Sequence, residues 1–348
     1  MAHNQIICET DTTTLAGELL PDGNKTISKL ESAHSPFMPG TRIQYAWDST
    51  SLGWLKECPR KYFYHMIEGW IGRGDSIHLE FGIIYHEAHE TYEHARFEGL
   101  DHDTALCRTV RHLLMRTWRD GAPWRAAKDL SPDDKASLKC REYLVRTVVW
   151  YMDKFQDDPA KTKMSAHSGK PMIELHFQFE AGFNINFDQP YVMCGYLDRI
   201  VEFQGQAFVM DRKTTTSTLG SYYFDQYDPD NQMSFYTVAS QVAFHTPVKG
   251  VIVDAAQIAV GFSRFVRSFV FKTPDQIGEW MQDLQIYLRQ AEVYAEKNYW
   301  PMNDKSCHKY GGCIFRSICS KSPQVRDKFL ESSFERREWN PLEPRGPR

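Results

Sequence analysis

The sequence predicts an α/β protein in which helices flank a central mixed β-sheet. Two observations support this prediction. Apolar residues recur at helical spacing through most of the first half of the chain. From Ile173 onward the pattern changes, and Leu175, Phe177 and Phe179 alternate with polar residues as they would in a strand. Further helical and strand-like runs then follow one another, which favours one mixed architecture over separate helical and sheet domains.

Length and composition limit the class of protein. The chain has 348 residues, of which 42% are hydrophobic, enough to bury a core without disulfides. No run of about 18 uncharged apolar residues offers a membrane span. The first residues lack a basic segment followed by an apolar one, so we expect a cytoplasmic protein, or a host-cytoplasmic one if the gene belongs to a phage. The net charge of −4 excludes a globally basic nucleic-acid coat but allows a local basic track.

The expected elements follow one another between two polar ends. Residues 1–40 are rich in Thr, Ser, Gly and Pro and are expected to form a flexible arm, and residues 321–348 to form a charged tail. The expected helices start at Ser49 and then cover residues 79–97, 104–119, 132–155, 231–244 and 275–298. The expected strands start at Ile173 and then cover residues 191–203, 207–213, 251–260 and 264–271.

Two of these strands form a hairpin that carries acidic residues. With a two-residue turn at Gln204-Gly205, Asp198 faces Asp211 across the hairpin, and Lys213 points to the same face as Asp211. Opposed carboxylates on neighbouring strands repel each other and need a compensating cation. Carboxylate oxygens suit Mg²⁺ or Mn²⁺, so the hairpin predicts a site for one of these ions.

Two alternatives to this site stay open. A three-residue loop at 204–206 would instead place Asp198 opposite Arg212. The acidic and basic side chains could also form ordinary cross-strand pairs on an exposed face, since an Asp-x-Lys tripeptide occurs often by chance.

A histidine on the second helix could complete such a site. His86 lies four residues before Glu90, so the two share a helix face. A zinc-protease motif needs two histidines four residues apart, whereas His86 and His89 are three apart, which excludes that reading. Gln232 and Tyr236 are likewise one helical turn apart and could both face the sheet, although a buried amphipathic pair would look the same.

Three of the eight cysteines gather near the C-terminus. Cys307, Cys313 and Cys319 are separated by five residues each, and Cys58 in the first helix is the expected fourth ligand. Four thiolates suit an iron–sulfur cluster or structural zinc. The absence of a Cys-x-x-Cys pair disfavours a zinc ribbon, and free buried cysteine is a further alternative.

The order of these motifs resembles the RecB-type branch of the PD-(D/E)XK nuclease superfamily, and in particular its members with an iron–sulfur cluster. Those members include AddB-type subunits, CRISPR-adaptation nucleases and phage exonucleases. The resemblance covers about residues 45–320 and rests on six segments in order: Cys58-Pro59-Arg60-Lys61-Tyr62, Gly82-x-x-x-His86, Gly195-Tyr196-Leu197-Asp198-Arg199, Asp211-Arg212-Lys213-Thr214, Gln232-x-x-x-Tyr236 and the late cysteines.

The resemblance implies a restriction-endonuclease-like core with an N-terminal helical region and a C-terminal segment joined through a cysteine-ligated cluster. Residues 41–320 would be one nuclease domain, with a helical insertion at about 98–165. The resemblance also implies a role for each motif residue. His86, Asp198, Asp211 and the carbonyl of Arg212 would bind the metal, Lys213 would be the catalytic lysine, Gln232 and Tyr236 would position DNA, and Cys58, Cys307, Cys313 and Cys319 would hold a 4Fe–4S cluster.

Glu174, on the strand before the hairpin, matches a carboxylate often found in this branch. The late cysteines depart from the family pattern, because many relatives have a two-residue gap before the five-residue one. This departure leaves the choice between iron–sulfur and zinc open.

The implied activity is a Mg²⁺- or Mn²⁺-dependent DNA nuclease, specifically an exonuclease acting on DNA ends or single strands. Recombination, repair or CRISPR-type proteins would be its partners, and no membrane is implied. Candidate DNA contacts are the basic residues Arg60, Lys61, Arg108, Arg111, Arg116, Arg119 and Arg212, with base stacking on Trp54, Tyr62 or Tyr64.

Two other functions remain as alternatives. The chain could be a non-catalytic DNA-binding or complex-building subunit that keeps the fold and the cluster. It could also be a four-cysteine zinc protein in which the acidic hairpin is incidental.

Overall fold

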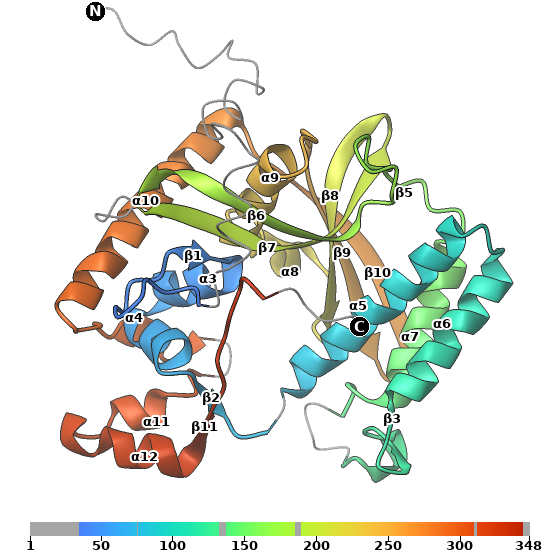
Figure 1. Cartoon of the computed structure of the whole chain (residues 1–348). Coiled ribbons are helices and arrows are strands. Elements are labelled where there is room, and N and C mark those ends of the chain that lie inside the picture. Colours follow the sequence, from blue (N-terminus) through green and yellow to red (C-terminus); the bar gives the residue numbers. More distant parts are fainter. Residues whose placement is uncertain (1–34, 75, 132–136, 185–188, 310–311, 344–348) are drawn as a thin grey trace, which may run out of the picture.

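The predicted central mixed sheet flanked by helices is confirmed by a computed structural model (Figure 1). It describes residues 35–343 apart from residues 75, 132–136, 185–188 and 310–311. Most of the arm expected at residues 1–40 lies outside the described residues. In the part of the chain that the structure describes, no helix is long and apolar enough to cross a membrane.

One long strand organises the sheet. In spatial order the sheet contains β1 (Ala46–Trp47), β7 (Pro190–Phe203), β8 (Gln206–Thr215), β9 (Gly250–Ala259) and β10 (Phe262–Phe271), and β5 (Lys161–Thr162) and β6 (Ile173–Asn184) pair with β7 as well. The pairs β1–β7 and β8–β9 are parallel, and the others are antiparallel. The sheet is therefore mixed, with β7 and β8 near its middle.

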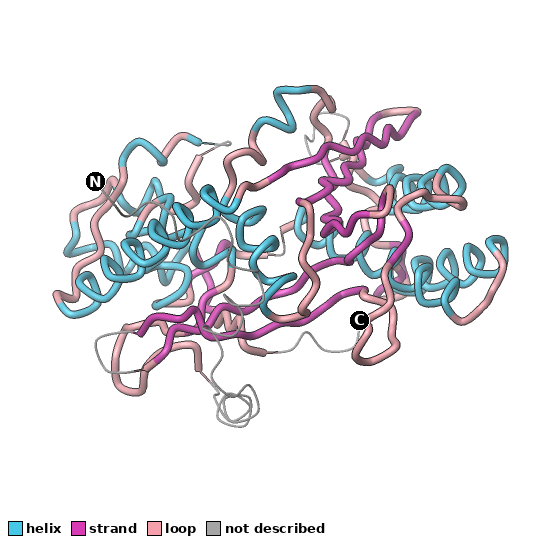
Figure 2. The backbone as a smooth tube through the Cα atoms, turned by 90° about the horizontal axis from the view of Figure 1, so that it is seen from above, coloured by secondary structure: helices cyan, strands magenta, loops and turns pink. Residues whose placement is uncertain are grey.

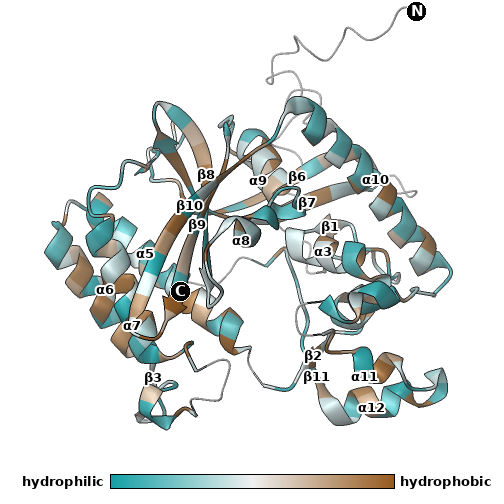
Figure 3. Ribbon diagram, turned by 180° about the vertical axis from the view of Figure 1, so that it is seen from behind, coloured by the Kyte–Doolittle hydropathy of each residue, from teal (hydrophilic) through white to brown (hydrophobic). Residues whose placement is uncertain are grey.

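Helices cover both faces of this sheet. On one face α3 (Ser49–Glu57), α9 (Asn231–Val242) and α10 (Pro274–Glu296) pack on the strands, with Leu52, Phe235 and Leu284 in one buried cluster. The other face packs against α5 (Ile77–Phe97), α6 (His102–Arg116) and α7 (Arg141–Lys154). Figures 2 and 3 show the strands, which are largely apolar, lying between these two helical layers.

Side chains at the helix starts explain where the helices begin. Asp48 accepts a hydrogen bond from the backbone of Ser51 and caps α3, and Asp101 caps α6 in the same way. Thr273 caps α10, whose first residue is Pro274. Each cap satisfies amide groups that the first helical turn leaves without partners.

A smaller subdomain contains the late cysteines. It is built from α4 (Pro59–Tyr62), β2 (Trp70–Gly72), α11 (Arg316–Cys319), α12 (Arg326–Ser333) and β11 (Phe334–Arg336). Strand β11 pairs antiparallel with β2, so the C-terminal segment returns to the region that follows the first helix. Tyr64, Phe315 and Leu330 are among the residues of its own small core.

Two predicted helices are shorter than expected. Helix α6 ends at Arg116 rather than at residue 119, because Trp118 and Arg119 form the short strand β3 (Trp118–Arg119), which pairs with β4 (Ala122–Pro123). Helix α7 begins at Arg141, whereas the prediction began at 132. Of the residues before it, 137–140 form turns, and 132–136 lie outside the described residues.

Candidate metal centre

The hairpin between β7 and β8 has the register that the two-residue turn predicts. Gln204 and Gly205 have φ angles of 52° and 74°, the left-handed values of a tight hairpin turn, and Phe203 pairs with Gln206. The ladder continues to Arg199 and Met210. This pairing shows that the three-residue-loop alternative is wrong. Beyond the ladder, the Oδ2 atom of Asp198 accepts a hydrogen bond of 2.7 Å from the backbone amide of Arg212.

Three side chains from different elements form a group that could hold a metal ion. His86 comes from α5, Glu174 from β6 and Asp198 from β7, and their ligand atoms all lie within 4.8 Å of one another. The Nδ1 atom of His86 is 3.3 Å from Oδ1 of Asp198 and 3.8 Å from Oε1 of Glu174. Its Nε2 atom is 3.2 Å from the carbonyl oxygen of Arg212. An imidazole with carboxylate and carbonyl oxygens is a donor set that suits Mg²⁺ or Mn²⁺.

The backbone of Glu174 has the left-handed conformation, with φ of 46°. A residue with a Cβ pays a steric cost there, and such positions cluster at functional sites. The left-handed conformation therefore occurs at the residue whose carboxylate lies beside His86 and Asp198.

A chain of hydrogen bonds runs from the hairpin to α9. The Nζ atom of Lys213 lies 2.8 Å from Oδ2 of Asp211 and donates to Oε1 of Gln232, also at 2.8 Å. Gln232 in turn donates to the hydroxyl of Tyr236 at 3.0 Å. The predicted pair on α9 therefore faces the sheet, and its first member holds the lysine.

The charges in this cluster shift one another. Burial alone would lower the pKa of His86, but Asp198 and Glu174 outweigh it and raise that pKa to about 9. Burial would raise the pKa of Asp198, but His86 and the Arg212 amide hold it well below its usual range. Burial raises the pKa of Asp211 to about 6, with Lys213 opposing and Asp198 reinforcing the shift. Such divergent environments are typical of reactive sites.

A buried ionic network supports the cluster from behind. Glu93, two helical turns after His86 on α5, accepts hydrogen bonds from both Arg199 and Arg212. These arginines directly follow Asp198 and Asp211 in the sequence, and their side chains are 3% and 1% exposed. Glu93 thus ties α5 to both strands that carry the acidic residues.

The comparisons with known proteins agree with this geometry. The model of the PD-(D/E)XK nuclease superfamily matches residues 49–320, which is more than half of the chain. The chain belongs to the PD-(D/E)XK nuclease superfamily.

Solved structures are similar in outline only. A protein named "Putative exonuclease" from Eubacterium rectale is 9% identical, with a TM-score of 0.44, over 82% of this chain and 92% of that one. The protein SSO0001 is 14% identical, with a TM-score of 0.33, over 88% of this chain and 96% of that one. No curated protein matches this nuclease.

The sequence did not single out Glu93 or Arg199. A carboxylate seven residues after His86, on the same helix face, is the signal that could have found Glu93. Arg199 directly follows Asp198, as Arg212 follows Asp211, and this repetition could have marked the two arginines as a pair.

The aromatic residues expected to stack on bases are not available for that role in the nuclease. Tyr62 is fully buried against Trp47, and Tyr64 is buried against Phe315. The half-buried Trp54 stacks on His65 at 4.4 Å. The sequence could not separate these rings from exposed ones, because their burial depends on contacts with distant residues such as Phe315.

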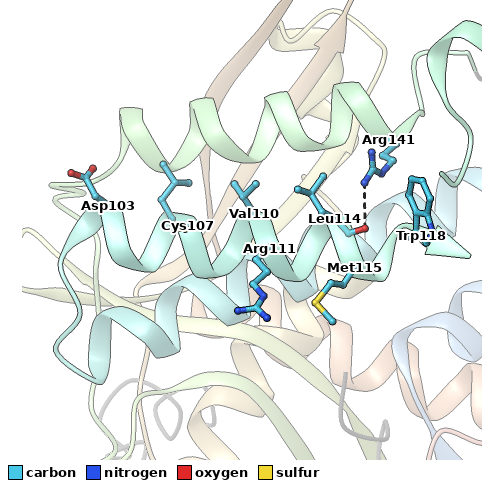
Figure 4. Close-up of a pocket in the computed structure, with 9 residues that line it drawn as sticks. Asp103, Cys107, Val110, Arg111, Leu114, Met115, Trp118 and Arg141 are labelled. Atoms are coloured by element: carbon cyan, nitrogen blue, oxygen red, sulfur yellow. Dashed lines mark hydrogen bonds between the residues drawn. The ribbon is translucent and has the colours of Figure 1, made fainter. Parts of the chain in front are cut away.

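Three of the four arginines expected to form a basic stripe are paired with acidic residues of the protein. Arg116 pairs with buried Glu87, Arg119 with Glu80 and Arg108 with Glu98. Arg111 instead borders a groove of about 900 Å³ on the outer side of α6, beside apolar residues such as Val110 and Met115 (Figure 4). Contact of the three paired arginines with DNA therefore stays a prediction, and it would compete with these ion pairs.

Cys58 and Cys307 both contact Asn303: the amide of Asn303 donates to Sγ of Cys58 at 3.3 Å, and Sγ of Cys307 lies 3.9 Å from its carbonyl oxygen. Cys313 is close enough to Cys58 and Cys307 to interact electrostatically, and so is Cys319 to Cys58 and Cys313. Burial raises the pKa of both Cys313 and Cys319. None of the cysteines that the structure describes forms a disulfide. Four thiols are a donor set for either a cluster or zinc. Among the described residues, however, only His86, Glu174 and Asp198 form a group whose ligand atoms lie within 4.8 Å of one another.

Proposed function

We propose that this chain is a Mg²⁺- or Mn²⁺-dependent deoxyribonuclease of the RecB type, and that it acts as an exonuclease on DNA ends or single strands. The observation that carries the proposal is the gathering of His86, Glu174 and Asp198 within 4.8 Å, beside the Asp211–Lys213 pair. Superfamily membership supports the same reaction class.

The metal would be held by His86, Asp198, Asp211 and the Arg212 carbonyl, with Glu174 as a further carboxylate. A divalent ion bound there would lower the pKa of a water ligand and neutralise negative charge on a phosphodiester oxygen. For a metal to bind, His86 must give up the proton that the nearby carboxylates stabilise in the metal-free site, since imidazole ligates in its neutral form.

Lys213 has the state and position to stabilise a phosphate. Burial opposes its charge, but Asp211 and Asp198 raise its pKa, so the ammonium group stays charged at neutral pH. A charged amine is a poor base, and we assign Lys213 to the negative charge that develops on the phosphate oxygens. Gln232 and Asp211 hold it by two hydrogen bonds and so fix its direction.

End-labelled DNA tests this activity. Single- and double-stranded oligonucleotides carrying the label at the 5′ or 3′ end are incubated with the protein and Mn²⁺, beside the Lys213→Ala variant. We expect progressive shortening from one end, and a rate lower by about 10²–10³-fold in the variant. Binding in a gel shift without cleavage in any divalent metal would instead identify a non-catalytic DNA-binding subunit.

We further propose that Cys58, Cys307, Cys313 and Cys319 ligate a 4Fe–4S cluster that joins the C-terminal segment to the first helices. Their mutual proximity and the pocket of about 420 Å³ beside Cys307 and Cys319 support this ligand set. Iron and sulfide analysis of anaerobically purified protein tests it. A colourless protein with one zinc per chain would favour the structural zinc alternative.

The remaining proposals concern the domain boundaries, the substrate, the compartment and the partners. We propose one nuclease domain over residues 41–320, with the helices at about 98–165 as an insertion. The substrate is DNA, the compartment is the cytoplasm, and the protein partners belong to recombination, repair or CRISPR-type pathways.

A further inference from the structure

A second pocket lies beside the metal centre. It has a volume of about 440 Å³ and is lined by the start of α3, by β7, by α9 and by the C-terminal segment Arg337–Glu343. The segment contributes Glu338, Trp339, Asn340, Pro341 and Glu343 to the lining. Pockets of this size hold small molecules or single groups of a larger ligand.

The pocket connects directly to the groups assigned to catalysis. Gln232, which accepts a hydrogen bond from Lys213, is part of its wall. Tyr196 also lines it and lies two residues before Asp198 on β7. Two residues of a strand span about 7 Å, so a ligand in the pocket would lie near the metal-binding carboxylate.

The floor between the two sites is aromatic. Tyr196 pairs with His176 of β6, and their rings lie 4.8 Å apart. In the register of β6 and β7, this pair lies two positions from Glu174 and Asp198. Aromatic rings next to a catalytic centre can stack on nucleobases. Each stacked base contributes about 1–3 kcal/mol to binding.

The walls suit a base and a sugar better than a phosphate. The rings of Phe177, Tyr196 and Trp339 are among the lining residues and give a base apolar surface to contact. Among the lining residues that the structure describes, the charged ones are Asp48, Glu338 and Glu343, all of them acidic. A further phosphate entering this pocket would meet like charges, so the strand is expected to end there.

The C-terminal segment is fixed at both of its ends. At one end β11 pairs with β2, and the amide of Arg337 donates to the carbonyl of Gly69 at 2.8 Å. At the other end Leu342 is buried beside Tyr45 and Val192. Figure 1 shows this segment, in red, running from β11 towards α3 and β7. A segment held at both ends can act as a wall.

We propose that this pocket binds the base and sugar of the terminal nucleotide of a DNA strand, with the base stacked on Tyr196 and the C-terminal segment as the end wall. This inference rests on the proposed nuclease function and deepens it. It gives a physical reason for attack from an end, because a strand that continues past the pocket would have to pass acidic side chains and an anchored segment.

Fluorescence of 2-aminopurine, which is quenched when the base stacks, tests the proposal. The base is placed at the 5′ end, at the 3′ end or in the middle of a single-stranded oligonucleotide. Each of the three oligonucleotides is titrated with protein in the presence of Ca²⁺, so that binding is measured separately from cleavage. We expect quenching at one terminus only. Tyr196→Phe should keep it, whereas Tyr196→Ala should lose it and weaken DNA binding about tenfold.

Two further variants guard against a folding defect. Trp339→Ala changes a half-exposed ring of the end wall and should also reduce the terminal quenching. Tyr299→Ala removes an exposed ring next to the cysteine subdomain and should leave the quenching unchanged. Circular dichroism confirms that each variant is folded before it is compared.

The outcomes separate this inference from the proposed function. Equal quenching at the central position, or full terminal quenching in Tyr196→Ala, would overturn the pocket as a terminal-nucleotide site. Cleavage in Mn²⁺ without any terminal quenching would also overturn the pocket while leaving the nuclease intact. Terminal quenching without cleavage would keep the pocket and refute the nuclease.

Discussion

The backbone amide of Arg212 donates a hydrogen bond of 2.7 Å to Oδ2 of Asp198, at the point where the β7–β8 ladder ends. One carboxylate oxygen, Oδ2, thereby takes the place of a backbone carbonyl as the acceptor for this amide. The other oxygen, Oδ1, lies 3.3 Å from Nδ1 of His86. The carbonyl of the same Arg212 lies 3.2 Å from the other nitrogen of His86. The backbone of one residue of β8 therefore fixes how the strand acid and the helix histidine meet.

Lys213 should matter more to catalysis than the glutamine that holds it. We expect Lys213→Met to lower the cleavage rate at saturating DNA by about 10²–10³-fold, because the charge on the phosphate loses its cation. Gln232→Ala should lower it by about tenfold, since Asp211 still holds the lysine. Thr237→Ala on the same helix is the control. A wild-type rate for Gln232→Ala would contradict the assigned role.

Glu93 should support stability as well as the metal site. Glu93→Gln leaves Arg199 and Arg212 buried without their shared carboxylate, which should cost about 3 kcal/mol in the free energy of unfolding. Glu98→Gln removes an exposed pair with Arg108 and should cost less than about 1 kcal/mol. Urea denaturation measures both. Equal losses in the two variants would refute a special role for Glu93.

Lys139 predicts a pH dependence of stability that is separate from the metal site. Its side chain is buried beside Phe81, with Nζ donating to Thr214, and burial lowers its pKa from 10.5 to about 7. Between these two values the unfolded chain holds a proton that the folded chain lacks, so this residue makes stability rise with pH across that window.

Lys139→Met should abolish this contribution. We expect the stability of the wild type, relative to the variant, to increase by up to about 5 kcal/mol between neutral pH and the upper end of the window. Urea midpoints measured for both proteins at each pH give the difference. A difference that stays constant with pH would show that Lys139 remains charged in the folded protein.

The cysteine cluster should depend on each of its four ligands. Cys307→Ser is expected to lose iron and the broad visible absorbance of thiolate-bound iron, and to loosen the C-terminal segment. Cys107→Ser changes an exposed thiol on α6 and should retain both. Iron analysis with limited proteolysis measures the effect. Full iron content in Cys307→Ser would exclude this cysteine as a ligand.

Local rules were enough to predict the elements that carry the site. A two-residue turn at Gln204-Gly205 predicts the observed register of the strands, although the sequence alone also allowed a three-residue loop. Hydrophobic alternation and spacing located the helices that carry His86 and Gln232. These features are short-range, so they can be read from the sequence without knowing how the helices pack.

Long-range packing was beyond such rules. Burial of Tyr62 and Tyr64, and the pairing of Arg116 with Glu87, depend on which helices meet in space. The pocket beside the metal centre likewise needs a C-terminal segment to return to β7 from the cysteine subdomain. No local pattern in residues 321–348 indicates this return.

Binding of Mn²⁺, measured by isothermal titration calorimetry, tests the central claim most directly. The account predicts metal binding to the wild-type protein that is strongly weakened in Asp198→Asn and in His86→Ala, with both variants folded and with DNA cleavage lost in parallel. Undiminished Mn²⁺ binding in both variants would contradict the account, because the strand acid and the helix histidine would then not share an ion.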